Sequence, residues 1–506
     1  MSLSLAAVLA ESALRRPEHP ALVTTDATLT YAELWAGARR HAAVLRGQGI
    51  GPGDRVALLL PNAPCFPMAY FGALALGVTL VPIPTTLRTD EIAYVLADSG
   101  ARLLICTEDA RHGHGGAAAA RTATPVLTDA ALDAGTDAVD ALVPRTPDDI
   151  ALVLYTSGTT GRPKGAMLTH LSVFLNVELG RESPFAMHAD DVLLGCLPLF
   201  HTFGQICGMN TAFRAGATVV LMERFDGPRA LDLMATHGCT VLMGVPTMYL
   251  ALLAAAEHPT RPFRLDRAYS GGAALPVAVL EEFEARFGCP IYEGYGLTET
   301  SPVVAYNQRA WPRRPGTVGK PIWGVDVAIA RSDVDDRIEL LPAGEVGEVV
   351  IRGHNVMAGY LNRPEATAEV LVDGWFRSAD LGLLDADGYL RIVDRKKDLV
   401  IRGGYNVYPR ELEEILARHP AVAQVAVIGV PHDTLGEEVC AVVVPRPGAA
   451  DEALPGRIVD WCRERMAAHK YPRLAVLTDA MPLGPSGKVL KRELTARFAT
   501  PGARRP

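Results

Sequence analysis

Short apolar runs alternate with helix-length segments over the first 310 residues of the chain. RVALLLPN (55–62) is followed by a segment of helix length and then by VTLVPIP (78–84). The alternation recurs through ATVVLME (217–223), GPRALDLMATHG (227–238) and CTVLMGVP (239–246). Strands that are apolar throughout and alternate with helices are typical of parallel sheets covered by helices on both faces. The pattern therefore predicts an α/β fold in which two such units pack together.

The pattern changes between residues 315 and 395, where short strands are separated by frequent glycine turns. VDVAIA, GEVGEVVIRG and DGYLRIVD are the strand candidates, and they indicate an antiparallel sheet or a small barrel. A charged RKKD segment begins directly after Asp394, and mixed helix and strand patterns follow it. We therefore predict a large domain over residues 1–396 and a separate α+β domain over residues 397–506.

Residues 111–121, RHGHGGAAAAR, are rich in glycine and alanine and predict a mobile surface loop. His112 and His114 are metal-binding side chains, but a plain loop is the simpler interpretation of this segment.

Composition narrows the class of protein. The chain has 506 residues, 49% of them hydrophobic and 21% charged, and a net charge of −8 at pH 7. Such a length exceeds what one hydrophobic core supports, so at least two domains are expected. Because a nucleic-acid partner requires a basic face, the negative charge argues against one.

Targeting signals and cysteine usage favour a cytoplasmic protein. The first twenty residues lack a basic segment ahead of their apolar run, so they predict an amphipathic helix and not a signal peptide. Prolines divide the longest uncharged stretch, so no membrane span is expected. The eight cysteines form no C-x-x-C pair, which indicates buried, reduced thiols.

YTSGTTGRPKG (155–165) is the segment with the clearest chemistry. Its glycines let backbone N–H groups turn toward an anion, and its hydroxyls and one lysine add donors. It differs from the common nucleotide-binding loop, because Pro163 and Gly165 stand where that motif needs a glycine and a hydroxyl. The alternative is a flexible linker, but phosphate binding is favoured. The candidate residues are Thr156, Ser157, Gly158, Thr159, Thr160, Gly161 and Lys164.

This segment resembles the signature loop of the AMP-forming acyl-adenylate superfamily, which includes acyl-CoA synthetases, firefly luciferase and peptide-synthetase adenylation domains. Further blocks that resemble the family recur in order: SGGAALP (270–276), YEGYGLTET (292–300), DGWFRSADLG (373–382), IVDRKKDLVIRGGYNVYPRELEE (392–414) and PSGKVLKREL (485–494). The resemblance implies a large N-terminal domain of two packed doubly wound sheets with a small β-barrel-like subdomain. It also implies a small, mobile C-terminal α+β domain.

The resemblance assigns roles to individual residues. It implies that Lys488 is the catalytic lysine, that Glu299 is catalytic and holds Mg²⁺ with Thr156, and that Lys397 is the hinge of the small domain. The further nucleotide contacts that it implies are Gly272, Ala273, Tyr295, Gly296, Thr298, Asp380 and Arg395. Gly403 and Gly404 are expected to face the thiol arm of CoA. Ala379 stands where the family usually has glycine.

The character of the pocket for the acyl group is inferred from the residue types that are absent. LPLFHTFGQICGMN (197–210) and LMGVPTMYLALL (242–253) contain no Lys, Arg, Asp or Glu, so they offer no partner for a second charge on the acid. An apolar pocket is therefore expected. The candidate acyl-binding residues are His201, Phe203, Gly204, Met243 and Gly271, although packing is a close rival for His201.

The blocks most resemble those of bacterial medium- or long-chain fatty acid–CoA ligases, with ATP, Mg²⁺ and CoA as cofactors. Two alternatives remain open: a fatty acyl-AMP ligase that loads an acyl carrier protein, and an inactive nucleotide- or acyl-binding protein. The first is disfavoured because no insertion is evident between Gly319 and Asp394. The expected oligomeric state is a monomer or a homodimer.

Overall fold

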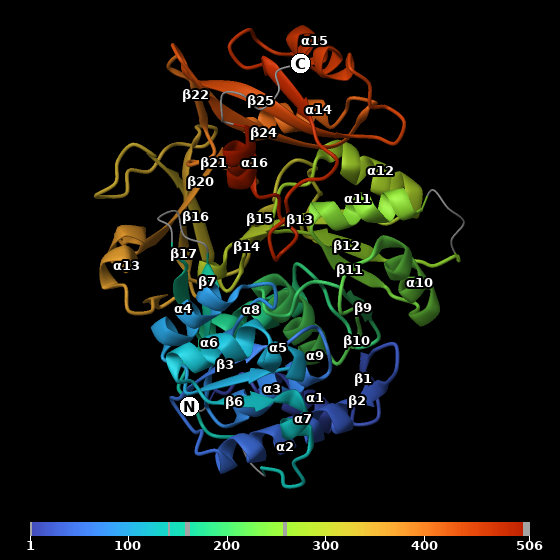
Figure 1. Cartoon of the computed structure of the whole chain (residues 1–506), viewed down its shortest axis with the longest axis vertical. Coiled ribbons are helices and arrows are strands. Elements are labelled where there is room, and N and C mark those ends of the chain that lie inside the picture. Colours follow the sequence, from blue (N-terminus) through green and yellow to red (C-terminus); the bar gives the residue numbers. More distant parts are fainter. Residues whose placement is uncertain (1–2, 140–141, 157–161, 257–260, 499–506) are drawn as a thin grey trace.

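The computed structural model describes residues 3–139, 142–156, 162–256 and 261–498. The fold is mixed α/β, with a large N-terminal body built on several sheets and a smaller C-terminal body above it in Figure 1. Helices and strands alternate through the large body as the apolar pattern predicts.

Within the described ranges, one sheet of the large body holds nine strands in the order β15-β14-β13-β12-β11-β9-β10-β1-β2. The strands from β13 to β1 in this order run parallel, whereas β14, β15 and β2 pair antiparallel with their neighbours. Their bounds are β1 Pro20–Val23, β2 Thr28–Thr30, β9 Val192–Gly195, β10 Thr218–Leu221, β11 Val241–Gly244, β12 Arg267–Ser270, β13 Ile291–Gly296, β14 Val303–Tyr306 and β15 Lys320–Pro321.

A second sheet of the large body has the order β18-β8-β7-β4-β3-β5-β6, and it is parallel from β7 to β6. Its strands are β3 Arg55–Leu59, β4 Thr79–Pro82, β5 Leu103–Cys106, β6 Val126–Thr128, β7 Ile150–Thr156, β8 Lys164–Thr169 and β18 Gly359–Tyr360. The two packed sheets confirm the expected architecture.

Helices cover these sheets and begin and end where the sequence provides caps. The carboxylate of Asp226 accepts from the N–H of Arg229 at 3.0 Å to start α10, and Gly238 ends it in a left-handed conformation. The helices of the large body are α1 Ala7–Arg15, α2 Tyr31–Gly47, α3 Cys65–Ala75, α4 Thr89–Ser99, α5 Glu108–His112, α6 His114–Thr122, α7 Asp129–Asp133, α8 His170–Glu182, α9 Thr211–Ala215, α10 Gly227–His237, α11 Pro246–Ala255, α12 Val277–Phe287 and α13 Pro364–Val370.

The glycine-punctuated region forms the predicted antiparallel sheet, with the order β16-β17-β20-β19 and β21 on β20. Its strands are β16 Val325–Ala330, β17 Gly347–Gly353, β19 Leu371–Val372, β20 Trp375–Leu384 and β21 Leu390–Arg395. Asp380 of β20 pairs in register with Arg395 of β21, so the sheet brings two predicted site residues together.

The smaller body has its own sheet, β23-β22-β25-β24 with β26 on β25, and its own apolar cores. Its elements are β22 Val400–Arg402, β23 Tyr405–Val407, α14 Pro409–Leu416, β24 Val422–His432, β25 Gly436–Pro445, α15 Leu454–Arg465, β26 Leu474–Leu477 and α16 Lys491–Phe498. This is the α+β composition that the sequence predicts for the C-terminal part.

One local prediction is wrong. Residues 111–121 lie mostly in α5 and α6. A hydrogen bond of 2.9 Å joins His114 Nδ1 to Thr89 Oγ1. Ala118 and Ala119 are buried. Alanine has a high helix propensity, and the burial of these alanines offsets the low helix propensity of the glycines. After the glycine-rich loop, Lys164–Thr169 forms β8 and His170–Glu182 forms α8.

All eight cysteines are free and buried, as expected for structural thiols. Burial raises the pKa of each of them above its ordinary value. Among the described helices, none combines the length and the apolar character that crossing a membrane would require.

Candidate functional site

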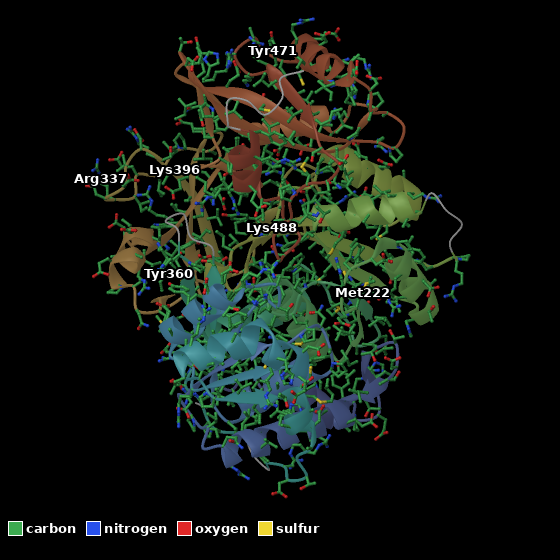
Figure 2. The ribbon with its side chains drawn as sticks, in the orientation of Figure 1. Met222, Arg337, Tyr360, Lys396, Tyr471 and Lys488 are labelled. Carbon is green, nitrogen blue, oxygen red and sulfur yellow. The ribbon has the colours of Figure 1, made fainter. Side chains whose placement is uncertain are left out.

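The predicted site residues gather where strands of both sheets end and the smaller body meets the larger one. Thr156 ends β7, Gly271 and Gly272 follow β12, and Glu299 lies just beyond β13. The carboxyl ends of parallel strands are the usual ligand-binding edge of α/β sheets. Figure 2 shows Lys488 at the same level, between the two bodies.

Lys488 comes from the loop that precedes α16 and reaches into the large body. A Cβ atom at Gly272 would lie 3.1 Å from Lys488 Cε, so the absence of a side chain there makes room for the lysine. The loop is held by Thr247, whose Oγ1 donates to the carbonyl of Gly487 at 3.1 Å. The structure thus brings Lys488 against the SGGAALP segment.

Glu299 is buried and its carboxylate is held by two hydroxyls. Thr156 Oγ1 donates to Glu299 Oε1 at 3.1 Å, and Tyr360 Oη donates to the same oxygen at 3.0 Å. The ammonium of Lys164 lies over the ring of Tyr360, 5.2 Å from its centroid. Thr156, Lys164 and Glu299 therefore belong to one cluster.

Asp380 has both oxygens engaged. Tyr295 Oη donates to Oδ2 at 2.7 Å, and Arg395 Nε lies 3.3 Å from Oδ1. Burial raises the pKa of Asp380, while the charge of Arg395 opposes this shift. Burial and the neighbouring Asp380 raise the pKa of Tyr295 well above its ordinary value, so its phenol stays protonated and donates.

Ala379, beside Asp380, takes up the conformation that a glycine would adopt without strain. Its φ is 59°, in the left-handed region. Its N–H donates to Glu348 Oε1 at 3.0 Å, and its carbonyl accepts from the N–H of Lys396 at 3.0 Å. These two bonds hold the backbone that carries Asp380 despite the side chain at this position.

The charges of these clusters act on Lys488. Burial, together with the guanidinium of Arg395, lowers the pKa of Lys488 to about 8, whereas Asp380 and Glu299 shift it in the opposite direction. A cation in a partly enclosed site beside two carboxylates suits work on anionic reactants.

A small cavity beside Lys488 shares Leu197 and Gly204 with a second cavity, and the two together are called the passage. Its outer part is lined by Lys488, Gly272, His201, Phe203 and Gly204, together with Leu197, Pro198, Val245 and Ser486. Its inner part shares Leu197 and Gly204 with the outer part and has a cavity volume of about 10 Å³. The inner lining is aliphatic or glycine: Leu193, Leu194, Gly195, Leu197, Leu199, Gly204, Gly208, Met209, Val219 and Met243.

His201 lines this passage as a neutral side chain. Burial lowers its pKa to about 3, and Lys488 contributes in the same direction. Its Nδ1 accepts from the N–H of Phe203 at 3.2 Å, so the proton sits on Nε2. Gly271 lies close by, because a Cβ there would be 3.3 Å from the Phe203 ring. All five predicted acyl-side residues thus lie around the passage.

Other predicted residues lie elsewhere or are not described. Ser157, Gly158, Thr159, Thr160 and Gly161 fall outside the described residues. Ala273 lies in the segment that follows β12, Gly296 ends β13, and Thr298 lies just beyond that strand. Lys397 is exposed in the turn between β21 and β22, and Gly403 and Gly404 form the turn of the β22–β23 hairpin on the smaller body. The structure does not bring this hairpin to Lys488.

Several contacts of the site were missed by sequence reasoning. Tyr360 belongs to the segment GHNVMAGYLNRPE (353–365), to which the sequence analysis assigns no role, yet its hydroxyl is hydrogen-bonded to Glu299. Residues 203–210 form a π-helix, η1, along the passage, and its Gly204 and Gly208 face the inner part. Bulges of this kind are frequent at functional sites, but no sequence pattern predicted one here.

Comparison with known proteins identifies the family. The AMP-binding enzyme model matches residues 9–361, and the AMP-binding enzyme C-terminal domain model matches residues 411–488. The chain belongs to the AMP-binding enzyme family. A feruloyl-CoA synthase of an Amycolatopsis species is 41% identical to this AMP-binding enzyme, over 93% of the chain and 94% of the relative. A long-chain-fatty-acid–CoA ligase of Bacillus subtilis is 33% identical, over 97% and 94%.

Among solved structures, ATP-bound MatB from Rhodopseudomonas palustris matches this AMP-binding enzyme with a TM-score of 0.90, at 33% identity over 99% of each chain. The two relatives are named as a CoA synthase and a CoA ligase, and this AMP-binding enzyme is accordingly an AMP-forming acid–thiol ligase that uses ATP, Mg²⁺ and CoA. The fatty-acid assignment is not decided by these relatives, because their named acids differ.

Proposed function

We propose that this enzyme activates an apolar monocarboxylic acid, a medium- or long-chain fatty acid, and transfers it to CoA. The observation that carries the proposal is the aliphatic lining of the inner passage beyond Lys488. No charged side chain belongs to that lining within the described residues. A second charge on the acid would therefore lose its hydration without gaining a partner.

The reaction has two steps at one site. An acid oxygen attacks the α-phosphorus of ATP and forms a P–O bond, while the bond from the α-phosphorus to the oxygen bridging to the β-phosphate breaks and pyrophosphate leaves with that oxygen and its electron pair. The thiol of CoA then attacks the acyl carbon, loses its proton, and AMP departs. Both partners of the first step are anions, so cations must offset the charge at the forming bond.

Named residues have roles in this scheme. Lys488 would bridge the acid carboxylate and the α-phosphate, a task that suits a compact charge on a long stem. Asp380 would accept from the ribose hydroxyls, with Arg395 beside it, and Tyr295 would stack on adenine next to Gly272 and Ala273. Lys164 and its loop would hold the outer phosphates.

Glu299 and Thr156 suit a magnesium ion. Their oxygens lie 3.1 Å apart, and Mg²⁺ is usually bound by one or two carboxylates together with substrate phosphates. Such an ion, when bound, neutralises charge on the phosphates and the leaving group. The protein contributes the orientation of the Glu299 carboxylate through the hydroxyls of Thr156 and Tyr360.

The second step requires a different arrangement of the smaller domain, which we assign to residues 397–506, with residues 1–396 as the larger one. Lys488 fills the space beside Gly272 that CoA would approach. Rotation about Lys397 would withdraw Lys488 and present Gly403 and Gly404 to the thiol arm. Both glycines have positive φ values, 57° and 84°, and neither carries a side chain to block close approach.

A hydroxycinnamic acid is the main rival substrate, because the 41% identical relative is named for one. Its ring hydroxyl would meet only Leu, Val, Met and Gly in the inner passage. An unpaired buried hydroxyl costs about 1–3 kcal/mol, or roughly 5- to 150-fold in selectivity. The passage is narrow, so a long chain requires Met209 and Met243 to turn aside, which their flexible side chains permit.

The test is a panel of acids assayed by ATP-dependent pyrophosphate release, with CoA and a holo carrier protein compared as acceptors. We expect octanoate to dodecanoate to exceed ferulate in kcat/KM, and unsubstituted cinnamate to exceed ferulate. A preference for ferulate over both would overturn the fatty-acid assignment. Transfer to the carrier protein but not to CoA would overturn the acceptor.

The pH dependence of the first step follows from the pKa of Lys488. Because that pKa is about 8 and the ammonium is the active form, kcat/KM for adenylation should fall as pH rises through this value. The fall should approach about tenfold per pH unit once the lysine is mostly neutral. Lys488→Arg, whose guanidinium stays charged, should be slower but lack this fall. A profile that is identical in both proteins would exclude Lys488 as its source.

A further inference from the structure

Helix α4 is bonded to both ends of the segment that carries the glycine-rich loop. Tyr155, just before the loop, donates from Oη to Asp98 Oδ2 at 2.8 Å. Pro163, just after the loop, accepts at its carbonyl from Tyr94 Oη at 2.8 Å. Tyr94 and Asp98 are four residues apart in α4 and therefore lie on one face of the helix.

A short strap ties this helix to the Glu299 cluster. Arg363 Nη2 donates to Asp98 Oδ1 at 2.7 Å, and Asn362 Nδ2 donates to the Asp98 carbonyl at 2.9 Å. In the same strap, Leu361 N–H donates to the Gly165 carbonyl at 2.8 Å. Tyr360, which begins the strap, bonds Glu299. The strap is residues 360–363.

Packing around these bonds leaves little freedom. The Asp98 side chain is 10% exposed and both of its oxygens are engaged, so loss of one partner leaves a charge without compensation. A Cβ at Gly165 would lie 3.1 Å from Cζ of Tyr155, so the glycine lets that ring cross the hairpin toward Asp98. The rings of Tyr94 and Tyr155 meet edge to face with centroids 6.2 Å apart.

We propose that Tyr94 and Asp98 are positioning residues for ATP. They hold Tyr155 and Pro163, the described residues that flank the glycine-rich loop, and the strap connects α4 to Glu299. Neither side chain is proposed to touch the nucleotide. The inference rests on the proposed role of this loop in holding phosphates, and α4 lies beside β7, from which the loop begins (Figure 1).

The variants Tyr94→Phe and Asp98→Asn test the inference. Tyr94→Phe removes only the hydroxyl, so it keeps the packing of the ring and should fold. Because small displacements of a phosphate-binding group are costly, we expect the KM for ATP to rise about 5- to 20-fold, and more in Asp98→Asn. The KM for the acid and the rate of thioester formation from supplied acyl-AMP should stay within about twofold.

Two control variants lose a comparable hydrogen bond or ion pair in another part of the protein. Tyr389→Phe removes a tyrosine hydroxyl that donates to the Pro312 carbonyl at 2.6 Å. Asp54→Asn removes the partner of Arg102, 2.7 Å away, and Asp54 precedes β3 at the sheet edge opposite the loop. Both controls should keep the wild-type KM for ATP.

Titration calorimetry with ATP alone separates this inference from the proposed function, because it requires no acid. Weaker ATP binding in Tyr94→Phe and Asp98→Asn than in the controls would support the inference, even if no acid released pyrophosphate. Equal ATP binding in all four variants would overturn it. Equal loss in both half-reactions would also overturn it, since that result indicates a general structural role.

Discussion

Replacing Lys488 with alanine is expected to slow adenylation at least roughly 10²-fold while leaving the second step intact, the scale of losing one preorganised charge contact. The lysine approaches the Gly272 segment from the smaller body and lies in the field of Asp380, Glu299 and Arg395. It is expected to act only while the acid attacks ATP. Pyrophosphate release should therefore collapse, whereas acyl-CoA formation from supplied acyl-AMP should continue at close to the wild-type rate.

Lys320 of β15 provides the control. Lys320 lies over the rings of Trp311 and Tyr389, 4.7 and 4.8 Å from their centroids, and Lys320→Ala should leave both steps near wild type. If Lys488→Ala slows both half-reactions by the same factor, the rotation proposed for the smaller domain is wrong.

Glu299→Gln is expected to reduce adenylation by roughly 10²- to 10³-fold and to raise the Mg²⁺ concentration needed for half-maximal rate. The substitution keeps the shape of the side chain and an oxygen to accept from Thr156 and Tyr360, but it removes the charge that would bind the ion. The measurement is pyrophosphate release titrated with MgCl₂ at fixed ATP.

Two comparisons sharpen this result. Tyr360→Phe removes one hydroxyl from Glu299 and leaves its charge, so a smaller loss is expected, on the order of tenfold. Glu178→Gln, at a carboxylate 2.7 Å from Arg214, should leave the Mg²⁺ dependence unchanged. An unaltered Mg²⁺ requirement in Glu299→Gln would mean that this carboxylate does not hold the ion.

Much of the fold follows from local patterns in the sequence. The apolar strands at 55–62 and 239–246 lie in parallel sheets, because continuous apolar runs suit strands buried on both faces. The glycine-punctuated strands after residue 315 form an antiparallel sheet, in which β19–β20 and β20–β21 are joined by short turns and the other pairs by longer connections. The helix over residues 114–122 was missed because its glycines were weighted above its buried alanines.

The site was predicted in part, since motifs give residue types but not long-range neighbours. Lys488, Asp380 and Glu299 were expected to converge, and they do. Tyr360 reaches Glu299 only because β18 pairs with β8, two strands separated by almost two hundred residues, and nothing near Tyr360 in the sequence indicates that pairing. The same holds for Asp98 and Arg363.

Ala379 departs from the family pattern, and the surrounding structure accommodates the change. Left-handed backbone at a residue with a Cβ costs about 1–2 kcal/mol. Hydrogen bonds on both sides of its peptide group nevertheless keep Asp380 aimed at Tyr295 and Arg395. The absence of the family's usual glycine at position 379, taken alone, would have argued against the predicted role of Asp380.

The burial of every native thiol gives this enzyme a practical advantage for single-molecule work. Maleimide dyes react with thiolates exposed to water, and Cys65, Cys440 and the remaining six are neither exposed nor readily ionised. One cysteine engineered on the surface of each body would thus accept donor and acceptor fluorophores without any prior removal of native cysteines. Energy transfer between the dyes would then test in real time, during turnover, the rotation that we propose for the smaller body.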